Sequence, residues 1–240
     1  MAWFRKKKEQ KIDMTKLPKH IAFIADGNGR WANRRGLARM LGHKAGKDAI
    51  KRVLDRCVEL KIEVVTMFCF STENFGRPKE EVDYIFNLFR QVKGDLLESL
   101  LKRNVRFIHM GDKSLLDKDI ADDLEEMERK TESCTGSIFN LALAYGSRHE
   151  IVDAVKKIIE SGDIDISEQS FKKYLYTTFL PDPDLIVRAS GEKRLSNFML
   201  YQAAYSEFYF PDKYWPDFDA KTVDDCIIEF QKRKRRYGKI

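Results

Sequence analysis

The sequence is poor in cysteine, and the few that occur are scattered. Four are present in 240 residues, and no two of them form a CxxC pair. This usage argues against a disulfide framework and against a cysteine-ligated zinc site, and it is typical of a reducing compartment. We therefore expect a cytoplasmic protein. The four residues are Cys57, Cys69, Cys134 and Cys226.

Long hydrophobic runs are absent as well. No stretch approaches the roughly 18 consecutive apolar residues of a transmembrane helix. The basic first eleven residues contain no apolar segment of the kind that secretory signals carry. Hydrophobic residues nevertheless make up 43% of the chain, with 16 Phe and 9 Tyr. That content is sufficient for a sizeable core, and the length favours one domain over two.

Positive charge is concentrated at the two ends of the chain. Residues 1–20 carry a net charge of +5 and residues 231–240 a net charge of +6, so the remaining 210 residues sum to −5. A nucleic-acid-binding domain more often spreads its basic charge over one face, so we expect no nucleic acid partner. The basic ends are interpreted either as solubilising tails or as patches that contact anionic lipid at the inner face of the membrane.

Short apolar runs alternate with longer amphipathic ones along the chain. Such alternation predicts right-handed βαβ crossovers and a mostly parallel sheet. We predict a single α/β domain whose central sheet has about six strands flanked by helices. The expected strands are 20–25, 64–70, 105–110, 138–144, 185–187 and 208–210. The expected helices are 43–60, 79–103, 114–133, 148–161, 167–178 and 220–236.

Glycines, hydroxyls, amides and arginines follow the expected strands. Ligands of open α/β sheets bind beyond the carboxyl ends of the strands, and these groups are suited to binding oxyanions. We therefore predict an anion site at this edge of the sheet. The segments concerned are 26–30, 71–78, 111–112, 145–148 and 188–197.

The most informative of these segments is Asp26-Gly27-Asn28-Gly29-Arg30. Its glycines let backbone N–H groups approach an anion closely. Asp26 can hold a hard divalent cation, and Arg30 can donate to phosphate oxygens. The segment is interpreted as a diphosphate site, with a tight strand-to-helix turn capped by the aspartate as the alternative.

A second anion-binding set follows the fifth expected strand. Arg188 and Arg194 flank a Ser-Gly turn, and Ser196 lies just beyond them. Two guanidiniums and two hydroxyls about such a turn can bind a terminal phosphate. A pair of surface arginines in salt bridges is the alternative. Glu207 precedes an apolar strand and is either a second carboxylate for a metal or a solvated acid.

The expected helix 79–103 is apolar along one side. Val82, Ile85 and Phe86 begin a helically spaced series that continues to Leu101. A helix face buried in the core is one explanation of this series. The helix also follows a phosphate-type loop and spans about 37 Å at 1.5 Å per residue. The alternative is therefore the wall of a hydrophobic tunnel for a long lipid.

Six motifs occur in order along the chain. They are DGNGRWA at 26–32, GHKAG at 42–46, FSTENFGRP at 70–78, RASGEKRLSNF at 188–198, YSEFYF at 205–210 and WPDF at 215–218. In order and spacing they resemble the cis-prenyltransferases, most closely the bacterial undecaprenyl diphosphate synthases. The resemblance covers residues 18–237 and implies a catalytic domain there, with a basic N-terminal tail at 1–17 and a C-terminal tail at 238–240.

This resemblance implies an enzyme that condenses isopentenyl diphosphate repeatedly onto an allylic diphosphate such as farnesyl diphosphate. It also implies Mg²⁺ as the cofactor, a homodimer, and a polyprenyl diphosphate product of about 55 carbons that serves as a cell-wall carrier lipid. Asp26 corresponds to the essential metal and diphosphate aspartate, and Glu207 to a second magnesium contact. The allylic-diphosphate pocket corresponds to Gly27, Asn28, Gly29, Arg30, Trp31, Arg39 and His43. The loop between the substrates corresponds to Ser71, Thr72, Glu73, Asn74, Phe75 and Arg77, and the isopentenyl-diphosphate clamp to Arg188, Arg194 and Ser196.

The proton acceptor is the one role with competing assignments. The acceptor proposed for the family corresponds to Asn74, but a neutral amide is a weak base. Asn74 as part of a relay, or the departing diphosphate as the acceptor, fits the chemistry better. Asn28 is the remaining candidate.

Four positions depart from the family pattern. Ala25 stands where Met is usual, Phe75 where Trp is common, Ser147 where Gly is common and Cys69 where Ala is frequent. Because Cys69 lies on the strand that leads into the expected tunnel, its bulk bears on product length.

Two other classes of function stay open at this point. A different phosphate-handling transferase should carry a P-loop or a nucleophile elbow, and neither GxxxxGK(S/T) nor GxSxG occurs in the chain. A non-catalytic scaffold of the same fold should have lost the Asp26 segment or the arginine pair, and both are present.

Overall fold

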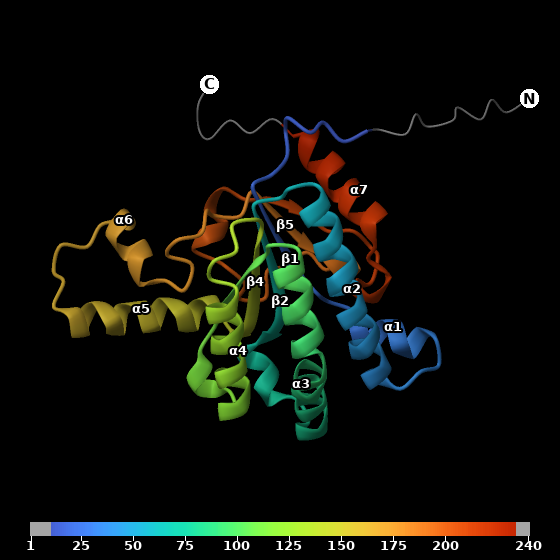
Figure 1. Cartoon of the computed structure of the whole chain (residues 1–240), viewed down its shortest axis with the longest axis horizontal. Helices are drawn as coiled ribbons and strands as arrows, with labels where there is room; N and C mark the ends of the chain where they lie inside the picture. Colours follow the sequence, from blue (N-terminus) through green and yellow to red (C-terminus); the bar gives the residue numbers. More distant parts are fainter. Residues whose placement is uncertain (1–10, 234–240) are drawn as a thin grey trace, which may run out of the picture.

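The computed structural model describes residues 11–233, whose six strands form one parallel sheet in the order β3-β4-β2-β1-β5-β6 (Figure 1). Every pair of neighbouring strands is parallel. The predicted α/β class and strand number are therefore confirmed. The strands are β1 (His20–Ile24), β2 (Val64–Ser71), β3 (Arg106–Met110), β4 (Ile138–Tyr145), β5 (Leu185–Arg188) and β6 (Glu207–Tyr209).

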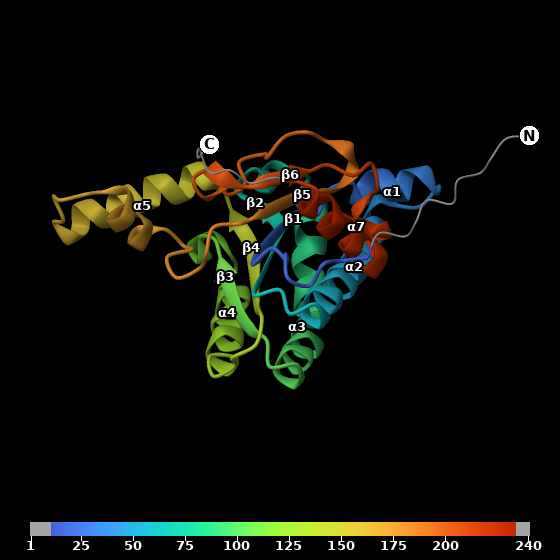
Figure 2. The ribbon, with the colours of Figure 1, turned by 90° about the horizontal axis from the view of Figure 1, so that it is seen from above.

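Helices follow most of the strands and cover the sheet. In Figure 2, α2, α3 and α4 lie on one side of the sheet, and the chain between β5 and β6 (orange) lies over the other side. The helices are α1 (Asn28–Arg34), α2 (Arg39–Glu59), α3 (Lys79–Lys102), α4 (Lys118–Lys130), α5 (Ser147–Ser161), α6 (Glu168–Phe171) and α7 (Ala220–Gln231).

The two main cores form because successive side chains of a buried strand point to opposite faces. Ile21 and Phe23 of β1 belong to the larger core, together with apolar residues of α2, α3, α4 and α7. Ala22 and Ile24 belong to the smaller core, in which Phe68 stacks on Phe198 with ring centroids 4.5 Å apart. The sheet is thus covered on both faces, which explains its nearly continuous apolar strands.

The structure contains one helix that was not expected and shortens one that was. The segment 26–34 contains the seven-residue α1, which the sequence did not predict because it is short and lacks an apolar period. The expected helix 167–178 is only α6 and one further turn, 172–174. It ends there because the Tyr176 N–H donates to the buried Glu150 carboxylate at 2.9 Å and not to a helical carbonyl.

The expected N-terminal tail is attached to the domain from Ile12 onward. Ile12 and Leu17 pack against the larger core, and Gln231 Nε2 at the end of α7 donates to the Asp13 carbonyl oxygen at 2.7 Å. The rest of this tail, the expected domain end at 237 and the tail 238–240 lie outside the described residues. Within 11–233, no helix combines the length and apolarity needed to cross a bilayer.

Candidate functional site

A hollow of about 560 Å³ opens at the carboxyl ends of β1, β2 and β5. Five arginines line it, against two acidic residues, so the hollow is electropositive. It therefore lies where ligands of parallel sheets are expected. The predicted site residues that line it are Asp26, Gly27, Asn28, Gly29, Arg30, Arg39, His43, Ser71, Asn74, Arg77, Arg188, Arg194 and Ser196.

Asp26 lies between two guanidinium groups. Its Oδ2 accepts a hydrogen bond from Arg188 Nη2 at 2.9 Å, and its Oδ1 lies 3.1 Å from Arg30 Nη2. Burial alone would raise the pKa of this carboxyl, but the hydrogen bonds and charges of the two arginines outweigh it and lower the pKa. Asp26 is therefore ionised at neutral pH.

The turn that carries Asp26 requires glycine at the next position. Gly27 has a φ of +96°, and a Cβ there would lie 2.6 Å from the Tyr214 ring. The Trp31 N–H donates to the Gly27 carbonyl oxygen at 2.8 Å, which begins α1 directly after the turn. The backbone N–H groups of the first turn of α1 consequently border the hollow, as an anion site requires.

Glu192 lies between two of the arginines and was not among the predicted site residues. Its Oε1 accepts from Arg30 Nη1 at 2.6 Å, and its Oε2 accepts from Arg194 Nη1 at 2.5 Å. The hydrogen bonds from Arg194 and Arg30 lower the pKa of the Glu192 carboxyl. Its position between Arg188 and Arg194 in the chain was a usable signal, because an acid placed there can hold both neighbouring cations.

Arg188 ties the β5 loop to β1 and is almost fully buried. Its Nη1 donates to the Arg194 carbonyl oxygen at 2.6 Å and to Ser196 Oγ at 2.7 Å, while Nη2 donates to Asp26. Its buried Nε has no hydrogen-bond partner among the described residues. One guanidinium thus joins Asp26 to the loop that follows β5.

The loop that follows β5 holds several residues in the left-handed region of backbone conformation. Ser190 has a φ of 72°, Ser196 of 49° and Asn197 of 62°. Non-glycine residues in this region carry strain that the surrounding structure must maintain. Asn197 supplies part of this support, because its Nδ2 donates to Glu73 Oε1 at 2.7 Å and its Oδ1 accepts from the Arg148 N–H at 2.9 Å.

Asn28 reaches the hollow because α1 packs directly on α2. A Cβ on Gly42 would lie 2.0 Å from the Asn28 carbonyl oxygen, and one on Gly46 would lie 2.4 Å from Asn28 Oδ1. Only glycine at these two positions allows so close an approach. Asn28 Oδ1 is buried and has no hydrogen-bond partner among the described residues, so it can accept a hydrogen bond from a ligand or its water.

We expect a Gly46→Ala variant to lose about 1–3 kcal/mol of unfolding free energy, because the new methyl group must displace the Asn28 side chain. The matched control is Gly94→Ala in α3, where a Cβ meets nothing within 4 Å. That change should raise the unfolding free energy by up to about 1 kcal/mol, since alanine favours a helix interior over glycine. Urea unfolding measures both, and equal effects of the two changes would contradict the close packing.

The first turn of α3 contributes a second acid that sequence reasoning missed. Glu81 Oε2 accepts from Arg39 Nε, and its Oε1 lies by His43 Nε2 and Arg77 Nη1, each contact being 3.1 Å. Burial lowers the pKa of His43, which Glu81 only partly offsets. His43 is therefore neutral at pH 7. Glu81 brings together two residues of the predicted allylic-diphosphate pocket, Arg39 and His43, and Arg77 of the loop between the substrates.

Ser71 and Asn74 fix the turn after β2 through reciprocal bonds. The Ser71 N–H donates to Asn74 Oδ1 at 3.2 Å, and the Ser71 side chain accepts from the Asn74 backbone. This engages the amide oxygen of Asn74 and leaves its Nδ2 as a donor. A donor amide in the hollow suits binding of a phosphate oxygen better than removal of a proton.

Five predicted site residues do not line the hollow. The Trp31 Nε1–H donates to Asp217 at 2.6 Å, Phe75 packs on Phe70 with ring centroids 4.9 Å apart, and Thr72 contacts Glu73. Glu73 instead supports the β5 loop through Asn197. The fifth is Glu207.

Glu207 lies toward the opposite edge of the sheet from Asp26, which corrects the expectation of a shared metal site within one chain. In the sheet, Glu207 pairs with Leu185 of β5, and Leu185 pairs with Ile21 near the start of β1. Asp26 is five residues farther along, which corresponds to about 16 Å at 3.3 Å per residue. Glu207 Oε2 instead accepts from Arg233 Nη1 at 2.7 Å.

One wall of the hollow is apolar. Phe68, Cys69 and Phe70 of β2 line it next to the polar groups. Phe70 continues into an aromatic cluster with Phe75 and Phe86, with the Phe70 and Phe86 ring centroids 4.9 Å apart. The site therefore places an anion-binding rim beside an apolar wall, an arrangement suited to an amphiphilic ligand.

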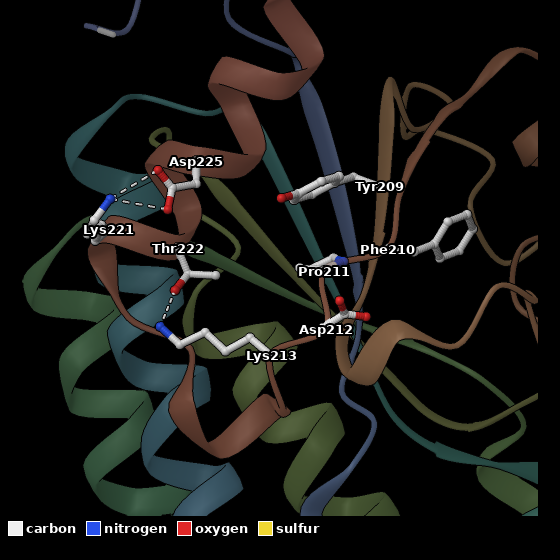
Figure 3. A pocket seen from close by; sticks show the side chains of 8 residues that line it. All are labelled: Tyr209, Phe210, Pro211, Asp212, Lys213, Lys221, Thr222 and Asp225. Atoms are coloured by element: carbon white, nitrogen blue, oxygen red, sulfur yellow. Dashed lines mark hydrogen bonds and ion pairs between the residues drawn. The ribbon is translucent and has the colours of Figure 1, made fainter. Parts of the chain in front are cut away.

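A second hollow, of about 410 Å³, lies between β6 and α7 (Figure 3). Its cations are already engaged: Lys221 pairs with Asp225 at 3.2 Å, and Lys213 Nζ donates to Thr222 Oγ1 at 2.6 Å. Figure 3 shows the Phe210 ring directed away from these groups. None of the predicted site residues lines this hollow.

The oxygen donors in the first hollow fit a divalent cation. The residues described contain no cluster of three or more His, Cys, Asp or Glu side chains that could hold a metal. Mg²⁺, however, is usually bound by one or two carboxylates together with substrate phosphates. Asp26 supplies such a carboxylate, and Asn28, whose Oδ1 has no partner among the described residues, lines the same hollow. The donor set thus suits a metal whose coordination a phosphate ligand completes.

Comparison with known proteins agrees on one family. A family model described as "putative undecaprenyl diphosphate synthase" matches residues 24–238. Two curated proteins named isoprenyl transferase are each 45% identical to this chain. The one from Oceanobacillus iheyensis matches over 95% of this chain and 93% of its own length. The one from Fusobacterium nucleatum matches over 92% of this chain and 96% of its own length.

Solved structures agree with the sequence comparison. Lavandulyl diphosphate synthase from Lavandula x intermedia, in complex with dimethylallyl diphosphate, has a TM-score of 0.90 and 35% identity, covering 94% of this chain and all of that one. A protein from Campylobacter jejuni titled a "probable undecaprenyl diphosphate synthase" has a TM-score of 0.78 and 35% identity, covering 92% and 99%.

Proposed function

The chain belongs to the undecaprenyl diphosphate synthase family and is a prenyltransferase, and we propose that it elongates farnesyl diphosphate with isopentenyl diphosphate in a Mg²⁺-dependent reaction. The product is undecaprenyl diphosphate, the carrier lipid of the cell wall. The observation that carries this proposal is the electropositive hollow around Asp26, whose other wall is apolar. An allylic diphosphate has two parts that match these, a diphosphate for the positive side chains and a hydrocarbon for the apolar wall.

The two substrates occupy different sides of the hollow in this proposal. The allylic diphosphate binds the first turn of α1 together with Arg39 and His43, and isopentenyl diphosphate binds Arg194 and Ser196. Arg188 holds Arg194 and Ser196 in place and lies between them and the allylic-diphosphate residues. The acids Glu81 and Glu192 neutralise the arginines in the free protein, and substrate phosphate oxygens take over these partners on binding.

The reaction breaks the bond between C1 of the allylic substrate and its diphosphate oxygen. The isopentenyl double bond supplies the electron pair of the new bond to C1, and a proton then leaves C2 of the isopentenyl unit. Arg30 and the α1 backbone N–H groups stabilise the negative charge that develops on the departing diphosphate. Mg²⁺ bound at Asp26 supplies Lewis acidity to the same oxygens. We assign proton acceptance to the departing diphosphate, with Asn74 donating from Nδ2 to a phosphate oxygen.

The growing hydrocarbon follows the apolar wall. Phe68, Cys69 and Phe70 of β2 begin this path, and the apolar face of α3 continues it as a tunnel wall. Each further buried CH₂ contributes about 0.8 kcal/mol, so elongation is favourable until the space is filled. Cys69 lies on the wall itself, where its size limits the length of the product.

The remaining parts of the proposal concern assembly and location. Val152, Val155 and Ile159 of α5 are exposed at helical spacing, and we assign this face to a homodimer interface. Sedimentation equilibrium gives the mass directly, and a single-chain mass at micromolar concentration would contradict the homodimer.

The four free cysteines support a cytoplasmic location, with the basic ends in peripheral contact with the inner face of the membrane.

The test is elongation by the purified full chain with farnesyl diphosphate, radiolabelled isopentenyl diphosphate, Mg²⁺ and detergent. We expect a Mg²⁺-dependent ladder of products that ends at about 55 carbons, which follows from a tunnel of finite length. A different end point would revise the product and keep the reaction. Folded protein that incorporates no label with any allylic primer would contradict the proposal and favour a non-catalytic scaffold.

A further inference from the structure

The turn between α1 and α2 exposes apolar side chains at a protruding position. Residues 33–41 are exposed without interruption, and Leu37, Met40 and Leu41 are 39%, 39% and 43% exposed. Figures 1 and 2 both show this segment extending away from the sheet, at the opposite end from α5. Isolated exposed apolar residues are ordinary, but three within five positions on one protrusion form a patch.

Basic residues surround this patch. From Gly27 to Lys47 the chain contains six Lys and Arg residues and no Asp or Glu. Some of these cations have acidic partners elsewhere, such as Arg35 with Asp217. Arg34 and Lys44 form no ion pair within the residues described, and Arg34 instead lies over the Tyr214 ring, 5.1 Å from its centroid. The patch is therefore apolar at its centre and positive at its rim.

We propose that the 33–41 turn is a membrane-docking surface, which inserts Leu37, Met40 and Leu41 into the headgroup region of an anionic lipid bilayer while Arg34 and Lys44 contact the lipid phosphates. Apolar side chains flanked by Lys and Arg are the composition of interfacial membrane segments. Positive side chains near an anionic leaflet add electrostatic attraction that falls off within a Debye length.

The position of the turn favours a bilayer over a protein partner. Three partly exposed side chains fall far short of the roughly 800 Å² per partner of a standard protein interface, whereas interfacial insertion needs no matching surface. The same two helices line the hollow through Asn28, Gly29, Arg39 and His43. A bilayer held at the turn therefore lies beside the mouth of the site. The choice of lipid as the occupant rests on the proposed function, because substrate and product are then amphiphiles that exchange with a membrane.

The test is flotation of the full chain with phosphatidylcholine vesicles, with and without phosphatidylglycerol, at low and at physiological ionic strength. The test variant is Leu37→Gln/Met40→Gln/Leu41→Gln. Its matched control is Met14→Gln/Leu101→Gln/Leu115→Gln, which also removes one Met and two Leu that are exposed, but at other places on the surface. We expect the test variant to bind anionic vesicles about tenfold more weakly, and the control to bind like the wild type.

A second variant, Arg34→Gln/Lys44→Gln, examines the charged rim without touching the apolar residues. It should weaken binding to anionic vesicles about tenfold at low salt and reduce the salt dependence of binding. Equal flotation of the wild type and both test variants would overturn the proposal and assign any membrane contact to the basic ends. A wild type that does not float with anionic vesicles at low salt would overturn it as well.

Two further measurements separate this proposal from its alternatives. A change of oligomeric mass in the apolar variant would identify the turn as a contact between protein copies and overturn the membrane assignment. Elongation in detergent, without vesicles, reports on the proposed function alone and should be the same for the wild type and the apolar variant. Flotation without elongation would therefore contradict the proposed function and leave the docking surface standing.

Discussion

An Asp26→Asn variant should lose prenyl transfer by about a thousandfold while keeping its fold. The change removes the carboxylate that we assign to a divalent cation in the hollow, and electrostatic groups of this kind contribute about 10²–10³ in rate each. It also replaces one of the two oxygens that face Arg188 Nη2 and Arg30 Nη2 with an NH₂ group, which cannot accept from a guanidinium. The measurement is the initial rate of radiolabel incorporation across a range of Mg²⁺ concentrations.

The Asp26 experiment needs a control for the loss of a negative charge. Asp48→Asn serves, because Asp48 is an exposed residue of α2 that pairs with Lys47 at 3.2 Å. It should retain wild-type activity. A stability cost accompanies Asp26→Asn at neutral pH, since a carboxyl with a lowered pKa stabilises the fold above its ordinary pKa and loses that contribution as the pH falls. Near-wild-type turnover by Asp26→Asn would contradict the assigned role.

Acidification should destabilise the fold through two buried histidines. His20 and His109 each have a pKa lowered from 6.5 to about 4, mainly because burial disfavours the charged imidazole. In the unfolded chain they bind protons near pH 6.5. The unfolded state therefore holds more protons between pH 6.5 and 4, and stability falls through that window. The loss is about 3 kcal/mol for each histidine.

Urea unfolding at several pH values tests this decline. His20 is held by Thr66 Oγ1 and the Pro181 carbonyl oxygen at 2.7 Å each, and His109 by the Leu143 carbonyl oxygen at 2.9 Å. His20→Gln and His109→Gln can keep part of these hydrogen bonds without titrating. Each variant should be less stable at pH 7 and should lose less stability than the wild type between pH 6.5 and 4. Declines as steep as that of the wild type would contradict the role of the two histidines.

The sequence predicted the sheet because its strands are short apolar runs separated by amphipathic ones. That pattern depends only on local burial, and all six predicted strands occur in the structure. The helix 167–178 failed because a distant carboxylate, Glu150, takes a backbone N–H that a helix would use. No local pattern records such a competitor. The short α1 is stabilised by its packing on Gly42 and Gly46 and lacks a pattern of its own.

The candidate site was predictable to the extent that its residues share one edge of the sheet. Asp26 lies just beyond β1 and Arg188 is the last residue of β5, and these strands are neighbours, so the two side chains meet. The position of Glu207 could not be predicted in this way, because it depends on the register of β6 against β5. That register pairs Glu207 with Leu185, at the start of β5 and away from Asp26. Glu81 and Glu192 were missed because acids in a phosphate-binding region look like solvated residues until their arginine partners are known.

These two glutamates determine how the first hollow responds to small anions. Glu81 and Glu192 each occupy cations that a ligand would need. A ligand with a single negative charge gains little by exchanging with them, because it replaces one carboxylate contact by another of similar strength. A diphosphate carries enough charge to engage both groups of cations at once. The protein therefore sets a threshold of ligand charge, and the common monoanions of its surroundings fall below that threshold.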